Sequence, residues 1–105
     1  MDSIHAAAHI TGGGLYDNLP RVLSSDCAAI IDRRSWEVPP LFKLIQSMGG
    51  VPDVEMFRTF NMGVGMVLVV EKGAEASVIE ALTEAGESAW VIGQITSGGS
   101  DVTIL

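Results

Sequence analysis

The chain has 105 residues, the size of one small domain, which leaves little room for a second one. Hydrophobic residues make up 48% and charged residues 18% of the sequence, which excludes a disordered chain. Thirteen acidic and six basic residues give a formal net charge of −7. So few bases cannot neutralise nucleic-acid phosphates, and the same charge disfavours an anionic membrane surface. We therefore expect an acidic globular domain that binds neither nucleic acid nor membrane.

The single cysteine, Cys27, cannot form an intramolecular disulfide, and no second thiol is present to help complete a zinc site. This cysteine usage predicts a cytoplasmic protein. We interpret the Cys27 side chain as a small buried hydrophobic group.

The first part of the chain predicts a strand, a helix and a second strand. Residues 4–10 are read as a buried strand that leads into the loop 11–14, although their alanines also favour a helix. Apolar residues at helical spacing predict a helix over 15–23, in which Pro20 bends the helix or starts a second turn. The short apolar run 28–32 predicts the next strand.

Two helices and a strand are expected in the middle of the chain. Pro40 suits the first turn of a helix that stops at the glycine pair 49–50, and Asp53 is expected to cap a second, shorter helix. The apolar stripe of the first of these helices consists of Leu41, Leu44, Ile45 and Met48 and is expected to face the core. We interpret Trp36, Phe42, Met48 and Phe57 as core side chains rather than cofactor contacts. Residues 64–71 predict a strand that is apolar on both faces, which indicates a central position in a sheet.

The last part of the chain predicts a helix over 76–85, a strand over 89–96, a turn over 97–100 and a final strand over 101–105. The predicted order is therefore β-α-β-α-α-β-α-β-β. We expect a single α+β domain over residues 1–105, in which helices cover one mixed β-sheet.

The sequence Thr-Gly-Gly-Gly at 11–14 lies between a predicted strand and a predicted helix. The backbone N–H groups of such a loop, together with the positive end of the helix dipole, can form an anion site. A tight turn that needs positive φ also explains the glycines. The loop does not match a Walker motif, because no Lys-Ser or Lys-Thr pair follows it.

His9 lies immediately before this loop, where it is placed to donate a hydrogen bond to an anion or to transfer a proton. A histidine bonded to a neighbouring backbone group is the alternative. His5 and His9 would be about 13 Å apart on a strand, so we do not expect a shared metal ion.

Asn61 and Gly63 lie where the chain enters the apolar strand 64–71. A glycine at such a position indicates a bulge or a group that lies close to the backbone. That group is either a ligand or a packed helix.

Four segments occur in an order that resembles a known family. They are Ala-His-Ile-Thr-Gly-Gly-Gly at 8–14, Asn-Leu-Pro-Arg-Val-Leu at 18–23, Glu-Met-Phe-Arg-Thr-Phe-Asn-Met-Gly-Val-Gly-Met at 55–66 and Gly-Glu-Ser-Ala-Trp-Val-Ile-Gly at 86–93. Together they resemble the C-terminal domain of the phosphoribosylformylglycinamidine cyclo-ligases, also called aminoimidazole ribonucleotide (AIR) synthetases. The resemblance spans nearly the whole chain and implies that domain's partly ferredoxin-like fold.

The resemblance implies a ligase of de novo purine biosynthesis that converts formylglycinamidine ribonucleotide to aminoimidazole ribonucleotide. ATP activates the formamide oxygen of the substrate, and an amidine nitrogen then closes the imidazole ring with loss of phosphate. Family members also have an N-terminal domain that binds ATP and forms the homodimer, and nothing in residues 1–105 matches it. The chain is therefore expected to be a C-terminal fragment, inactive alone and prone to self-association, with ATP and Mg²⁺ bound mainly by the missing part.

In this interpretation His9 is the candidate catalytic residue. The substrate or phosphate is expected to contact Thr11, Gly12, Gly13, Gly14, Asn61 and Gly63. No metal ligand and no tightly bound cofactor are expected in this chain. The alternatives are a stand-alone, non-enzymatic module that binds nucleotides or a partner chain, and the same domain of selenophosphate synthetase or thiamine monophosphate kinase.

Overall fold

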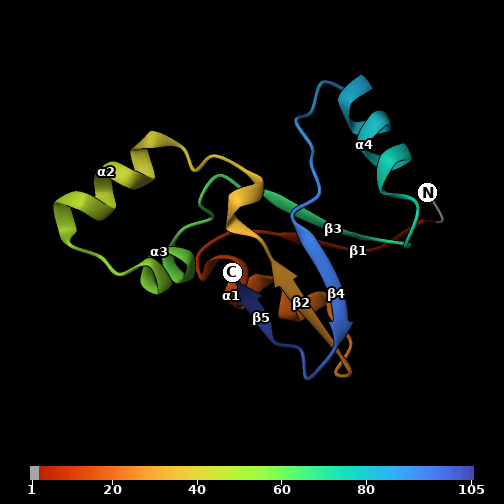
Figure 1. Ribbon diagram of the computed structural model, residues 1–105, viewed down its shortest axis with the longest axis horizontal. Coiled ribbons are helices and arrows are strands. Elements are labelled where there is room, and N and C mark those ends of the chain that lie inside the picture. The colour runs from red at the N-terminus through yellow and green to blue at the C-terminus, as the bar shows by residue number, and fades with distance from the viewer. Residues whose placement is uncertain (1–2) are drawn as a thin grey trace.

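The computed structural model describes residues 3–105 and follows the expected order of strands and helices, which confirms the α+β class (Figure 1). The elements are β1 (Ile4–His9), α1 (Gly14–Asn18), β2 (Cys27–Ile31), α2 (Pro40–Gly49), α3 (Asp53–Thr59), β3 (Met66–Val70), α4 (Glu75–Glu84), β4 (Gly93–Ser97) and β5 (Val102–Ile104). Two 3₁₀ helices, η1 (Pro20–Val22) and η2 (Arg33–Ser35), flank β2. Among the described residues, no helix has the length and apolar character needed to cross a membrane.

The strands form two sheets, whereas a single mixed sheet was expected. β1 and β3 form an antiparallel pair in which His9 lies opposite Met66. β2 is the middle strand of the second sheet, antiparallel to β4 and parallel to β5. The expected central position of the strand at 64–71 is therefore wrong for the described part of the chain, where β3 pairs with β1 alone.

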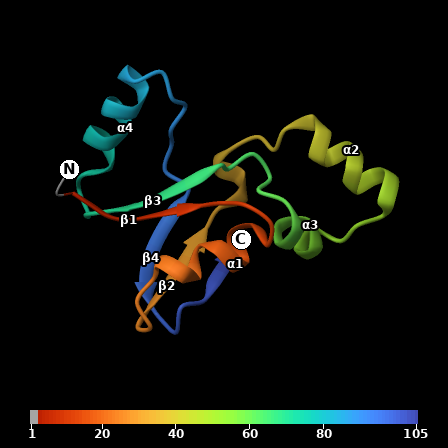
Figure 2. The ribbon, with the colours of Figure 1, turned by 180° about the vertical axis from the view of Figure 1, so that it is seen from behind.

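The core lies where α1, α3 and the inner faces of the two sheets meet. Seen from behind, α1 lies across the three-stranded sheet (Figure 2). The buried cluster consists of Ala8, Ile10, Leu15, Leu19, Ala29, Ile31, Met56, Phe57, Met62, Val64, Val67 and Ile104. Leu15 and Met56 are fully buried, and burying such a side chain stabilises the fold by about 1.5–3 kcal/mol.

The helix expected over 15–23 is divided into two short helices. α1 ends at Asn18, and Pro20 begins the 3₁₀ turn η1. Proline has no N–H to continue the helical ladder, and its ring clashes with the preceding turn. The alternative in which Pro20 starts a second turn is therefore correct.

Helix α2 extends away from both sheets (Figure 1). It begins at Pro40 and ends before Gly50, which has a left-handed φ of 61°, as the sequence predicts. Its apolar stripe is not buried, because Leu41, Leu44 and Met48 are 62%, 56% and 80% exposed. The interpretation of Met48 as a core residue is therefore wrong.

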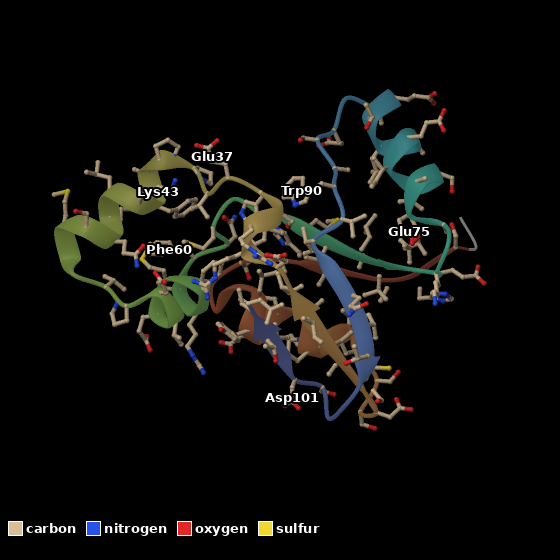
Figure 3. The ribbon with its side chains drawn as sticks, in the orientation of Figure 1. Glu37, Lys43, Phe60, Glu75, Trp90 and Asp101 are labelled. Atoms are coloured by element: carbon tan, nitrogen blue, oxygen red, sulfur yellow. The ribbon has the colours of Figure 1, made fainter. Side chains whose placement is uncertain are left out.

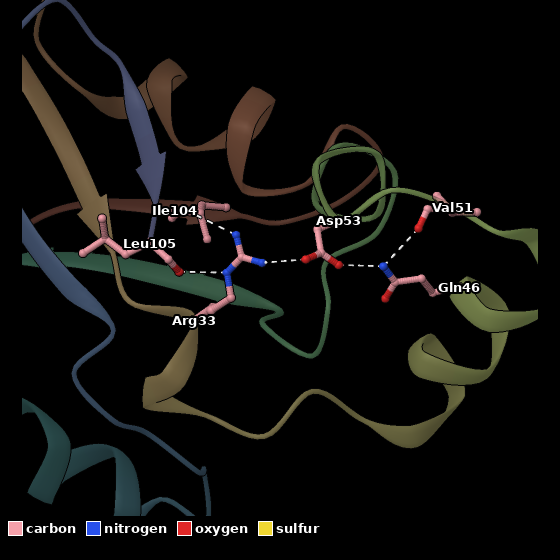
Figure 4. A network of polar contacts seen from close by, with 6 residues as sticks. All are labelled: Arg33, Gln46, Val51, Asp53, Ile104 and Leu105. Carbon is pink, nitrogen blue, oxygen red and sulfur yellow. Dashed lines mark hydrogen bonds and ion pairs between the residues drawn. The ribbon is translucent and has the colours of Figure 1, made fainter.

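Asp53 does not cap α3, contrary to expectation, because it is already the first residue of the helix and Pro52 precedes it as the cap. Its carboxylate instead accepts hydrogen bonds from Arg33 Nη1 at 3.1 Å and from Gln46 Nε2 at 2.6 Å (Figure 4). Arg33 Nε also donates to the backbone oxygen of Leu105 at 2.7 Å. This network ties α2 and α3 to the end of the chain after β5.

The strand expected over 89–96 begins later, at Gly93. The segment before it crosses from α4 to β4 and carries Trp90, whose ring lies 6.3 Å from that of Trp36. The Trp90 Nε1 is buried without a hydrogen-bond partner in the described part of the protein. A side chain in place of Gly93 would collide with the Ile30 carbonyl oxygen, which explains the glycine.

Candidate functional site

A cavity of about 260 Å³ lies between the loop 11–14 and the segment that leads from α3 into β3. Its lining consists of Ile10, Thr11, Gly12, Phe42, Thr59, Phe60 and Asn61. The fold therefore brings Thr11 and Gly12 together with Asn61, a predicted site residue that is far from them in the sequence.

The loop 11–14 leaves N–H groups available to a ligand. The Gly14 N–H donates to the Thr11 carbonyl oxygen at 3.0 Å. Within residues 3–105, the N–H groups of Thr11, Gly12 and Gly13 have no protein acceptor, and Thr11 and Gly12 are exposed. A turn with all its N–H groups bonded and buried would have excluded an anion site, and this loop is not such a turn.

Gly13 and Gly14 have structural reasons to be glycine. Their φ values are 95° and 63°, in the left-handed region that disfavours side chains. A Cβ at Gly14 would lie 1.8 Å from the Phe57 carbonyl oxygen, and one at Gly13 would lie 2.6 Å from the Asp17 side chain. The Asp17 carboxylate also opposes an anion at that end of the loop. Helix α1 has only five residues, so the expected help from a helix dipole is small.

The turn at 61–63 is shaped mainly by contacts within the protein. The Gly63 N–H donates to Asn61 Oδ1 at 2.9 Å, and Trp36 Nε1 donates to the Met62 carbonyl oxygen at 3.0 Å. Gly63 has a φ of 97°, and a Cβ there would lie 2.6 Å from Pro39 Cδ. The group close to the Gly63 backbone is therefore Pro39. Asn61 lines the cavity, and its amide nitrogen is the donor left for a ligand.

Aromatic rings form the wall of the cavity opposite the loop. The rings of Phe42 and Phe60 lie 5.5 Å apart, with Phe60 between α2 and α3 (Figure 3). The sequence interpretation placed Phe42 in the core, against which it packs partly buried, and did not name Thr59 or Phe60 as site residues. Their position next to Asn61 in the sequence was the signal available for the last two.

His9 lies on the exposed face of β1 and is not part of the cavity lining. His5 lies on the same face, consistent with the alternation of side chains along a strand. A role for His9 in proton transfer stays a prediction.

A second cavity, of about 380 Å³, is lined mostly by apolar side chains and includes Cys27. Partial burial, followed by the negative charge of Asp26, raises the pKa of the Cys27 thiol. The thiol therefore stays protonated at neutral pH and is a poor nucleophile. Within residues 3–105, no cluster of three or more His, Cys, Asp or Glu side chains could hold a metal ion.

Residues 1–105 match the family described as AIR synthase related protein, C-terminal domain, and the chain belongs to this family. It is 52% identical over 103 residues to the phosphoribosylformylglycinamidine cyclo-ligase of Pseudothermotoga lettingae, with 98% of this chain and 31% of that protein covered. It is 50% identical over 99 residues to the protein of the same name from Coxiella burnetii (strain RSA 493 / Nine Mile phase I), with 94% and 28% covered. The cyclo-ligase of Geotalea daltonii is 50% identical over 93 residues, with 89% and 27% covered. The chain thus spans less than a third of the length of these relatives. The family resemblance of its sequence motifs is confirmed.

Proposed function

We propose that the chain is the C-terminal part of a phosphoribosylformylglycinamidine cyclo-ligase and forms one wall of its substrate site. The observation that carries this proposal is the identity of 52% over 98% of the chain to a protein of that name. The cavity between Thr11, Gly12 and Asn61 supports it, because hydrogen-bond donors gather there at an open surface.

The residues of the cavity suit a ligand with anionic oxygens. The Thr11 hydroxyl, the Gly12 N–H and the Asn61 amide can all donate hydrogen bonds. Hydrogen bonds to charged oxygens are stronger than those to neutral ones. In the proposed reaction they would hold the phosphate of formylglycinamidine ribonucleotide or the formamide oxygen on which negative charge develops. The aromatic pair Phe42 and Phe60 would exclude water from the opposite side.

The cavity does not suit a magnesium ion, because none of its lining residues carries a carboxylate. We therefore place the binding of ATP and Mg²⁺ in the part of the enzyme that this chain does not contain. A role for His9 requires that this other part extend the site to the exposed face of β1. We also propose that the full-length enzyme is cytoplasmic and forms a homodimer.

The test is a chimaera in which the 105 residues replace the matched region of the Coxiella burnetii protein. We expect the chimaera to form aminoimidazole ribonucleotide from formylglycinamidine ribonucleotide and ATP, and the chain alone to form none, because it lacks an ATP site. Thr11→Ala and Asn61→Ala should each lower kcat/KM of the chimaera by about tenfold or more. The control is Thr103→Ala, since Thr103 is exposed on β5. Ring closure by the isolated chain, or unchanged kinetics in both site variants, would contradict the proposal.

We propose further that two copies of the chain associate through the exposed face of α2, formed by Leu41, Leu44 and Met48. The accessible surface of 6435 Å² exceeds the roughly 5,700 Å² expected for a compact monomer of this mass. The exposed side chains of α2 contribute to this excess, and a standard interface buries about 800 Å² of each partner. Lys43 is the only charged residue of α2, so this helix places no carboxylate in the interface.

Light scattering at tens of micromolar protein, an order-of-magnitude choice for a weak interface, should show a dimer. Met48→Lys should convert it to a monomer by placing a charge in the interface. Met66→Lys is the matched control, because Met66 is also exposed but lies on β3. A monomeric parent chain would contradict the proposal, and dissociation by Met66→Lys alone would assign the interface to the two-stranded sheet.

A further inference from the structure

The side chain of Asn18 is the one buried polar side chain of the described core, with 4% of its surface exposed. Its amide nitrogen donates to the carbonyl oxygen of Gly14 at 2.8 Å and to those of Thr11 and Gly12 at 3.2 Å each. The Thr11 hydroxyl makes a longer contact, of 3.4 Å, to Asn18 Oδ1. One side chain at the end of α1 therefore binds three carbonyl groups of the loop before it.

These bonds determine where the N–H groups of the loop point. In a trans peptide unit, the C=O of one residue and the N–H of the next lie in one plane and point in opposite directions. Since Asn18 holds the carbonyls of Thr11 and Gly12 toward the interior, the N–H groups of Gly12 and Gly13 point away from it. This agrees with the absence of a protein acceptor for these two N–H groups within residues 3–105.

We infer that Asn18 is the positioning residue of the candidate site: its amide orients the loop so that N–H groups are presented to an anionic oxygen of the ligand. The inference rests on the proposed function, which assigns a phosphate or a substrate oxygen to this loop. Asn18 itself touches no ligand, and its effect passes through the backbone of Thr11 and Gly12.

The chemistry of the contact specifies asparagine. A leucine has nearly the same shape but would remove the side-chain donor from all three carbonyl oxygens, and that of Thr11 would keep the Gly14 N–H alone. An aspartate would place carboxylate oxygens against them, and acceptors facing acceptors repel. A glutamine is one methylene longer, and an extra methylene at a position that is only 4% exposed strains the packing.

The experiment uses the isotopically labelled 105-residue chain, observed by NMR. In the parent chain, the side-chain NH₂ protons of Asn18 should exchange with solvent at least about tenfold more slowly than those of the exposed Gln94, because only a local opening can release them. Equally fast exchange would overturn the inference, whatever the variants do.

Asn18→Leu and Asn18→Asp are then compared with Leu19→Ala, which removes core packing one residue further along without touching the loop carbonyls. In either Asn18 variant that keeps a dispersed spectrum, the Gly14 N–H should exchange about tenfold faster than in Leu19→Ala, since the loop loses its clamp. The Gly12 and Gly13 amide signals should also move. Gly14 exchange and loop shifts that match those of Leu19→Ala would show that Asn18 does not position the loop.

A titration with inorganic phosphate separates this inference from the proposed function. In the parent chain and in Leu19→Ala, phosphate should shift the Gly12 and Gly13 amide signals, and the shifts should be lost in the Asn18 variants. If phosphate shifts no loop signal in the parent while the exchange results hold, Asn18 still positions the loop and the anion site is wrong. If phosphate shifts these signals equally in the Asn18 variants, the anion site stands and the role of Asn18 is wrong.

Discussion

Gly14→Ala should abolish or nearly abolish folding of the chain. The new Cβ would lie 1.8 Å from the Phe57 carbonyl oxygen and 2.8 Å from that of Phe60, and backbone atoms cannot move aside as a flexible side chain can. The φ of 63° adds strain for any residue with a side chain. We expect the free energy of unfolding to fall by at least about 3 kcal/mol, a large part of the stability of a small domain. Urea titration followed by tryptophan fluorescence and circular dichroism measures the loss.

Gly12→Ala is the matched control in the same loop. A Cβ at Gly12 has no atom within 4 Å and no positive φ to oppose it. We expect an unchanged urea midpoint or a slight stabilisation through the lower entropy of the unfolded chain. If Gly12→Ala and Gly14→Ala lowered the free energy of unfolding equally, the close packing of Gly14 against α3 would be contradicted.

The glycine triplet shows how far the sequence could identify the candidate site. A strand, three glycines and a helix predicted either a tight turn with positive φ or a loop that offers N–H groups to an anion. The structure shows positive φ at Gly13 and Gly14 and leaves the N–H groups of residues 11–13 without an acceptor in the described part of the chain, and anion binding stays a prediction. The sequence could not separate the roles within the triplet, because Gly14 is constrained by the backbone of α3, more than forty residues away, which leaves Gly12 to line the cavity. Asn18 was missed as a positioning residue for a similar reason. Its three acceptors become neighbours only when the loop folds back over α1.

The order of elements could be read from local signals, but their environment could not. Periodic apolar residues and a glycine pair correctly predicted α2, since propensity and capping act within a few residues. The same periodicity wrongly predicted a buried face, because burial depends on what lies opposite the helix. Likewise, a strand apolar on both faces was assigned to the middle of a sheet, although β3 pairs only with β1 in the described part of the chain. Asp53 is a residue type that often caps helices, but here its carboxylate forms an ion pair with Arg33.

Arg33 holds the end of the chain against α3, so Arg33→Met should cost much more stability than an ordinary surface substitution. Methionine keeps the aliphatic stem but loses the donors to the backbone oxygen of Leu105, at 2.7 Å, and to Asp53, at 3.1 Å. It also removes a cation that lies 5.1 Å from the centre of the Phe57 ring. We expect a loss of about 1.5–3 kcal/mol in the free energy of unfolding, the range of hydrogen bonds made by a charged group.

Two further variants identify which of these contacts carries the effect. The Asp53 side chain is 62% exposed, so Asp53→Asn should cost only about 0–1 kcal/mol, as expected for a surface ion pair. Arg34→Met is the control for loss of an adjacent arginine. The Arg34 side chain is 81% exposed, and its ion pair within residues 3–105 is with Asp32 on its own turn, so the urea midpoint should not move. If Asp53→Asn were as damaging as Arg33→Met, the ion pair would be the main contribution of Arg33. We expect the smaller loss, because the ion pair faces solvent, whereas the backbone oxygen of Leu105 and the buried Phe57 ring fix the end of β5 to the core.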